Sequence, residues 1–284
     1  MKGLLRTLVA LSFYPVSLIA NYLRPGVRIL MFHRVDSLPH FDQLTVSPGR
    51  FSQQMDILAR SYRVISLTQA LTELANGKVK RNTVVITFDD GYLDNLTHAL
   101  PMMEERGLPA SVFVTTEFAS GAQQHPRYGS SARLHMNWGE VKEWLRFPGN
   151  EVGAHSRSHP YLQRVSDEQC REEIAGCMGD MAAAGVAHNG IFCYPSGDVT
   201  EREAHRVRAS GYVAAVTVAP GVNFPTTNRF WLHRTEVTDR DTPLLFRLKL
   251  AGCFDLIHGV LHVRRTRQFS KQSQVEKELK GVNH

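Results

Sequence analysis

Short apolar runs alternate with stretches of helical periodicity along most of the chain. Runs rich in branched and aromatic residues at 29–32, 83–88, 111–116, 151–155, 190–194 and 212–218 predict buried strands. Between them, apolar positions recur every three or four residues at 51–59, 67–75, 138–145, 166–185 and 201–210, which predicts helices. Residues 119–137 contain Gly, Pro and paired serines and predict a long loop. The alternation indicates parallel βα units.

A parallel sheet of this kind is either doubly wound or closed into a barrel. No phosphate-binding glycine motif follows any predicted strand, so a nucleotide-binding sheet has no support. The polar residues of interest instead follow several different strands: Asp89 and Asp90, His155, the 194–197 turn and His233. Sites built from several strand ends are typical of barrels. The sequence therefore favours a barrel.

Composition and charge narrow the class of protein. The chain has 284 residues, 43% of them hydrophobic and 21% charged, which is ordinary for a globular protein. Its four cysteines have no CxxC spacing, which argues against a thiolate zinc knuckle and a disulfide scaffold. Of the net charge of +6, residues 1–28 and 264–284 each carry +4 and the middle carries −2. This pattern favours an anionic membrane surface over nucleic acid as a partner.

The two ends differ from the middle of the chain. Residues 1–26 combine a basic start with an apolar run, as in a secretory signal, an uncleaved anchor, a membrane-surface helix or a helix docked on the domain. Residues 244–263 predict an amphipathic helix or helix pair, followed by a basic tail. We therefore expect an N-terminal segment at 1–26, a folded domain at 27–240, and an amphipathic segment with a tail at 241–284.

Two motifs carry candidate chemistry. Asp89 and Asp90 follow the clearest strand; crowded carboxylates repel each other and attract a metal, a cation or a proton, although a helix-capping role is equally compatible. His155 and His159 are four residues apart, a ligand spacing that lets two imidazoles on one helical turn face a common point. Two histidines and one aspartate leave a coordination position for water, as in catalytic zinc sites.

These motifs, with the Tyr194-Pro-Ser-Gly197 turn, resemble those of the NodB-type polysaccharide deacetylases, carbohydrate esterase family four. The segment Leu30-Met-Phe-His-Arg-Val35 resembles the branch acting on exopolysaccharide or cell-surface amino sugars. The resemblance implies a distorted (β/α)7-type barrel of parallel strands, with the apolar-basic terminal segments outside it. It also implies a hydrolase of linear amides that removes N-acetyl groups from amino sugars.

The resemblance also implies roles for individual residues. Asp89 matches the general base, and Asp90, His155 and His159 match the ligands of one divalent metal, Zn²⁺ by preference, with Co²⁺, Ni²⁺ or Fe²⁺ as alternatives. Ser196 matches a backbone N–H donor to the oxyanion. His233 is the nearest candidate for the general acid, although its register differs from the family motif.

One departure from the family keeps other functions open. Cys193 stands where many members carry an arginine that pairs with the catalytic aspartate, so this partner is expected to be missing. A catalytically inactive glycan-binding protein is therefore an alternative. The basic-apolar ends of the chain also leave open a deacylase or deformylase of a lipid-linked amino sugar, and phosphoester hydrolysis ranks last, since it needs more carboxylates. We expect a location at the bacterial cell envelope, either exported or associated with one face of the membrane.

Overall fold

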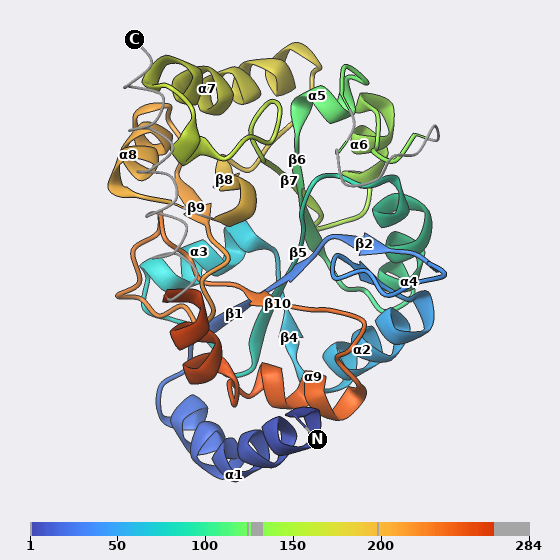
Figure 1. Ribbon diagram of the computed structural model, residues 1–284, viewed down its shortest axis with the longest axis vertical. Helices are drawn as coiled ribbons and strands as arrows, with labels where there is room; N and C mark the ends of the chain where they lie inside the picture. The colour runs from blue at the N-terminus through green and yellow to red at the C-terminus, as the bar shows by residue number, and fades with distance from the viewer. Residues whose placement is uncertain (1, 124, 126–132, 198, 264–284) are drawn as a thin grey trace.

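Eight of the strands form one parallel sheet that curls into an incomplete barrel with helices around it (Figure 1). This architecture is seen in a computed structural model that describes residues 2–123, 125, 133–197 and 199–263. It confirms the prediction of a distorted parallel barrel. The C-terminal tail beyond residue 263 lies outside the described residues.

Seven strands make the main path of the sheet, in the order β10-β1-β5-β6-β7-β8-β9. Their bounds are β1 Val27–Phe32, β5 Thr83–Phe88, β6 Ala110–Val114, β7 Glu151–Ala154, β8 Ile191–Cys193, β9 Ala214–Val216 and β10 Thr235–Glu236. β4 (Arg63–Val64) pairs with the start of β5, and β2 (Arg34–Val35) pairs with β3 (Thr45–Val46). Among the described residues no strand pairing joins β9 to β10, so the barrel is open there.

The helices begin at the capping residues that the sequence offers. Ser66 and Ser166 each accept a hydrogen bond from a backbone N–H three residues on, and Asn137 and Thr200 form capping boxes. The helices are α1 Lys2–Leu23, α2 Pro48–Ser61, α3 Leu67–Ala75, α4 Leu100–Glu104, α5 Thr116–Ala119, α6 Trp138–Trp144, α7 Asp167–Ala183, α8 Glu201–Ala209 and α9 Pro243–Leu250. A further helix spans 255–263, and shorter turns are η1 Asn95–Ala99, η2 Leu162–Arg164 and η3 Pro195–Gly197.

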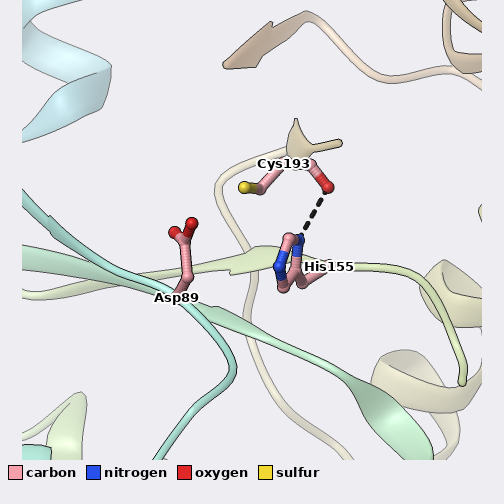
Figure 2. Close-up of side chains that lie close together, drawn as sticks. All are labelled: Asp89, His155 and Cys193. Atoms are coloured by element: carbon pink, nitrogen blue, oxygen red, sulfur yellow. Dashed lines mark hydrogen bonds between the residues drawn. The ribbon is translucent and has the colours of Figure 1, made fainter. Parts of the chain in front are cut away.

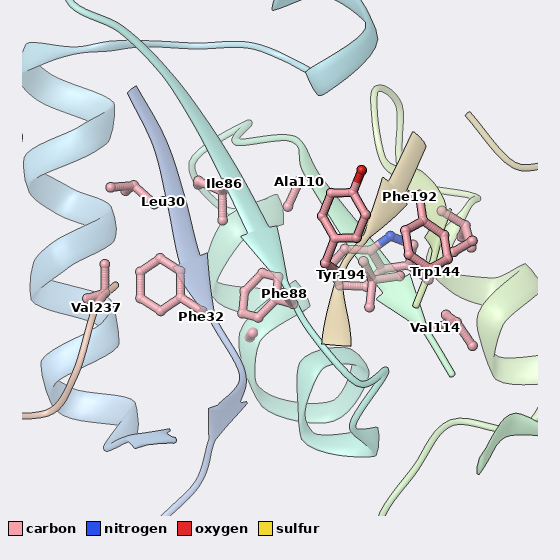
Figure 3. Close-up of a cluster of buried hydrophobic side chains, with 14 of the residues drawn as sticks. Leu30, Phe32, Ile86, Phe88, Ala110, Val114, Trp144, Phe192, Tyr194 and Val237 are labelled. Carbon is pink, nitrogen blue, oxygen red and sulfur yellow. The ribbon is translucent and has the colours of Figure 1, made fainter. Parts of the chain in front are cut away.

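Side chains that alternate along the strands build two apolar layers. One set, which includes Leu30, Phe32, Ile86 and Phe88, packs under the surrounding helices (Figure 3). The other set lines the inside of the barrel and packs against α3, with members such as Ile29, Val85, Phe113 and Val216. Successive side chains of a strand point to opposite faces, so a residue just beyond a strand tends to continue one of these two sets. This alternation decides which polar residues reach the site.

The N-terminal helix α1 packs outside the barrel on α9 (Figure 1). Ala10 on α1 is fully buried in a small cluster with Leu248 of α9 and Phe254. Of the helices in the described part of the chain, none combines the length and the hydropathy that a membrane span requires.

Candidate active site

Two adjacent carboxylates follow β5 and point to different neighbours. The side chain of Asp89 points into the barrel, as those of Val85 and Thr87 do. Its backbone N–H donates to the carbonyl oxygen of Phe32 in the neighbouring strand β1. Asp90 has a left-handed backbone (φ 68°), as does Gly91 (φ 66°). Both carboxylates are buried, so each needs a compensating charge.

Left-handed backbone is concentrated at this end of the sheet. Among the described residues, positive φ occurs outside glycine at Asn82, Asp90, Ser156, His159 and Ser196. All but Asn82 belong to the three motifs singled out in the sequence. Such conformations cost about 1–3 kcal/mol each and persist only where the surroundings impose them, commonly at functional sites.

The two histidines lie on a loop after β7, not on the helical turn expected from their spacing. The loop is closed by Ser156, whose hydroxyl accepts a hydrogen bond from the backbone N–H of His159 (3.0 Å). Glu173 of α7 accepts bonds from the backbone N–H groups of Arg157 (3.0 Å) and Ser158 (2.9 Å) and from the Ser158 hydroxyl (2.6 Å). The buried carboxylate of Glu173 thus holds the loop between the two imidazoles. The sequence placed Glu173 inside a helix without indicating this role.

Asp90, His155 and His159 converge as a metal site requires. Oδ1 of Asp90 lies 3.4 Å from Nε2 of His155 and 3.5 Å from Nε2 of His159, and it is buried without a well-aligned hydrogen bond. On the other side of its ring, Nδ1 of His155 lies 2.8 Å from the carbonyl oxygen of Cys193 (Figure 2). A proton on Nδ1 leaves the Nε2 lone pair free, which is the usual support of a metal-binding imidazole. The three residues therefore fit a divalent cation.

The electrostatics agree with a cation at this point. Burial alone would raise the pKa of Asp90, but His159 and His155 outweigh it and hold that pKa well below its usual value. Burial lowers the pKa of His159 to about 4, so its ring is neutral and able to bind a metal. Although burial opposes it, the pKa of His155 is raised well above normal by Cys193 and by the neighbouring carboxylates. The cluster therefore attracts positive charge.

Asp89 has an arginine partner after all, contrary to the expectation from Cys193. The guanidinium of Arg234, the residue before β10, donates from Nη1 and Nη2 to the two carboxylate oxygens of Asp89 at 2.6 and 2.8 Å. Its Nη2 also lies 3.2 Å from Sγ of Cys193, and its Nε donates to the carbonyl oxygen of Thr217. Burial opposes the charge on Asp89, but Arg234 outweighs it and lowers the pKa of Asp89. The sequence reasoning missed Arg234 because no motif marks it.

Arg234 also decides between the two triads of metal-binding residue types at this end. Besides Asp90, His155 and His159, the side chains of Asp89, His155 and Cys193 lie near one another (Figure 2). In that second triad both oxygens of Asp89 already accept hydrogen bonds from a cation. The geometry therefore favours the first triad as the metal site and leaves Asp89 as a paired, ionised carboxylate.

The structure does not bring His233 to this cluster. Leu232 belongs to the inner apolar set and Arg234 reaches Asp89, so His233 between them points to the other face. Its backbone is held on both sides by Asn223, and its ring packs against Gly221. Besides His155, an imidazole that lies close to Asp89 is that of His33, with Nε2 3.9 Å from Oδ2.

The remaining site features lie around these groups. Ser196 follows β8 at the same end of the sheet in the left-handed turn η3, where the next residue, Gly197, has no room for a side chain against Val218. Beside His159, the rings of Phe118, His135 and Tyr92 stack in sequence, with centroid distances of 4.5 Å and 4.7 Å for the last two contacts. These rings form an aromatic wall next to the metal-site residues.

A paired carboxylate beside a two-histidine, one-aspartate cluster, both just after the ends of parallel strands, is an arrangement that fits the active site of a hydrolase. The model of the polysaccharide deacetylase family matches residues 76–215, which contain Asp89, Asp90, His155, His159 and Ser196. The chain therefore carries a polysaccharide deacetylase domain, and the resemblance inferred from its motifs is confirmed.

Individual relatives agree with this assignment. The chain is 26% identical over 212 residues to YxkH of Bacillus subtilis (strain 168), a polysaccharide deacetylase by name, covering 74% of this chain and 71% of the relative. In fold it is similar to the Streptococcus pyogenes deacetylase PplD (TM-score 0.70, 20% identity, covering 80% of this chain and 99% of that one). It is also similar to IcaB from Ammonifex degensii (TM-score 0.64, 23% identity, covering 79% and 97%).

Proposed function

We propose that this protein is a metal-dependent deacetylase that removes N-acetyl groups from the amino sugars of a bacterial cell-envelope polysaccharide. One observation carries the proposal: Asp89 is held ionised by Arg234 directly beside the Asp90–His155–His159 cluster. Hydrolysis of an acetamide forms a bond from a water oxygen to the carbonyl carbon and breaks the C–N bond, which yields acetate and a free amine.

Each residue then has a definite task. Asp90, His155 and His159 would hold the divalent metal, which when bound acidifies water and polarises the acetamide carbonyl. Asp89 accepts the proton of the attacking water, and Arg234 fixes the direction of its carboxylate. The backbone N–H of Ser196 is proposed to donate to the oxygen that becomes negatively charged. These roles match the chemistry that the family resemblance implied.

The leaving amine needs a proton, and we assign this role to His33 in place of His233. His33 follows β1 at the same sheet end as Asp89, and its side chain is 16% exposed, so it borders the site and reaches solvent. The comparison that tests it is His33→Gln against His233→Gln, measured as kcat for acetate release. We expect a loss of at least about a hundredfold for the first and little change for the second. The opposite ranking would restore His233.

The function is tested by acetate release from N-acetylglucosamine polymers, with partly acetylated cell-wall glycan as the second substrate. The purified full chain should release acetate, lose this activity after chelation and regain it when Zn²⁺ or Co²⁺ is added. Asp89→Asn should be inactive while it still binds metal. Binding of the polymers without any acetate release would instead support the glycan-binding alternative. That alternative rested on the missing arginine at position 193, and Arg234 supplies the missing charge.

A further inference from the structure

From residue 10 onward, the helix α1 packs on the protein through small and hydrogen-bonding side chains. Ala10 is buried, and Tyr14, Ser17 and Asn21 are half-buried; these positions are three or four residues apart and so share one face of the helix. Asn21 donates from Nδ2 to the carbonyl oxygen of Ala251 just after α9 (3.0 Å). The face of α1 that contacts the domain is therefore formed mainly by small and hydrogen-bonding side chains.

The opposite face of α1 is apolar and exposed. Val16 is 64% exposed, Ile19 61% and Leu23 74%, and Phe13 and Tyr22 are also exposed. An amphipathic helix on a globular protein normally turns its apolar stripe to the core and its polar residues to water. In α1 the arrangement is reversed. Exposure of this apolar face to water is unfavourable, so we expect another apolar phase or surface to cover it.

The helix 255–263 repeats the reversal. Leu256 is 72% exposed, and Val260 and Leu261 are exposed, while the polar side chains are turned inward. Asp255 forms an ion pair with Arg28 (2.9 Å), and His258 stacks on Phe254. Twelve of the sixteen large hydrophobic side chains that are exposed in the described part of the chain lie within 11–23 and 244–263. We call these exposed side chains the terminal-helix surface.

The charges around the terminal-helix surface indicate which kind of partner binds it. Residues 1–24 contain three basic and no acidic residues, and the arginines at 264, 265 and 267 follow the last described helix in the sequence. Within 243–263 the acidic residue is Asp255, which is neutralised by Arg28. A second copy of the chain would bring two basic surfaces together, whereas an anionic bilayer offers both an apolar phase and opposite charge.

We propose that the terminal-helix surface binds anionic lipid bilayers, with α1 lying in the interface plane. None of the described helices is long and apolar enough to span a bilayer, so insertion stops at the boundary between headgroups and acyl chains. The exposed apolar side chains enter that boundary, and the basic residues at both ends of the chain contact the lipid phosphates. This binding needs no catalytic residue.

The fold also determines which way the active site faces. Arg81, two residues before β5, donates to the carbonyl oxygen of Tyr22 in the last turn of α1 (3.2 Å), so this end of α1 lies where β5 begins. Asp89 lies where β5 ends, about 20 Å further at the usual rise of ~3.3 Å per residue. The docked enzyme therefore opens away from the bilayer. This step rests on the proposed function, and it favours a glycan extending from the membrane over a sugar next to a lipid anchor.

Vesicle flotation of the full chain tests the proposal. Vesicles of phosphatidylcholine alone are compared with vesicles in which roughly a third of the lipid is phosphatidylglycerol. We expect flotation with the anionic vesicles that weakens as salt is raised. In the variant Val16→Gln/Ile19→Gln/Leu23→Gln the vesicle partition should fall by at least about tenfold. The matched control Leu38→Gln/Tyr161→Gln/Val213→Gln, which replaces exposed apolar residues elsewhere, should behave as the unmodified protein.

Three results would overturn the proposal: no flotation of the unmodified protein, equal flotation of the α1 variant, or a dimer in light scattering that the α1 variant converts to a monomer. The metal content of each variant shows that it is folded. The two proposals are tested independently. Flotation without acetate release from any glycan would contradict the proposed function but not membrane binding. Acetate release without flotation leaves the deacetylase intact.

Discussion

Arg234 and Asp89 are 145 positions apart in the chain and form a bidentate, fully buried ion pair inside the barrel. Arg234 also contacts Cys193, the residue that stands where many relatives carry an arginine. A positive charge beside the Asp89 carboxylate is therefore present, but it comes from the residue before β10, on the far side of β1, and not from the last residue of β8. The site keeps its electrostatics although the motif has changed.

Replacing Arg234 should disable catalysis and weaken the fold. Arg234→Met leaves a buried carboxylate without its cation, which typically costs about 3–5 kcal/mol of stability. We expect kcat/KM to fall by about a hundredfold or more in the protein that remains folded, measured with thermal melting alongside acetate release. Arg60→Met, at an exposed position of α2, is the control.

A double variant sharpens that test. Cys193→Arg/Arg234→Met moves the guanidinium to the position used by many relatives, next to the same carboxylate. Part of the lost activity should return, because the requirement is a cation at Asp89 and not a particular place in the chain. If the double variant is no better than Arg234→Met, the contact to Thr217 or the packing of Arg234 matters more than its charge.

Removing the metal-binding side chains should remove the metal. His155→Gln/His159→Gln should lower the metal content, measured by elemental analysis, from about one divalent ion per chain to near zero. His205→Gln changes an exposed histidine of α8 and should keep the full content. A chain that holds the same amount of metal in both variants would place the ion elsewhere.

Glu173 should act on the metal through the loop that it holds. Glu173→Gln removes charge from the acceptor of three hydrogen bonds from residues 157 and 158, so we expect metal affinity to fall by about 10–100-fold. The neighbouring Glu172 is exposed on the same helix, and Glu172→Gln should leave affinity unchanged. A purely structural role would instead lower the melting temperature of the metal-free protein without changing the metal Kd.

Ser196 should contribute its backbone and not its hydroxyl. Ser196 has φ 59°, a conformation that glycine adopts freely, so Ser196→Gly should keep kcat within about twofold. Gly197→Ala is expected to damage the turn, because the added Cβ would lie 2.3 Å from a methyl group of Val218. A large loss of kcat in Ser196→Gly, with unchanged melting, would show that the hydroxyl takes part.

The sequence alone was sufficient for the barrel and for the metal cluster. Short continuous apolar runs and helices with period 3.6 reflect burial directly, and parallel strands bring the residues after them to one edge. That is why the aspartate pair, His155 and His159 could be grouped before any contact was known, while the family resemblance selected Asp90 as the ligand. Their loop geometry was not predictable in this way, since Ser156 and Glu173 shape it through backbone hydrogen bonds that leave no spacing pattern.

Tertiary structure alone decided the partner of Asp89, the direction of His233 and the exposed face of α1. An ion pair across 145 residues depends on which strands become neighbours, and local sequence does not encode that. Whether His233 or Arg234 faces the site depends on the strand register, because a shift of one residue moves every side chain to the opposite face of the sheet. The apolar run of α1 was visible in the sequence, but only its packing through Ala10, Ser17 and Asn21 shows that the apolar residues point outward.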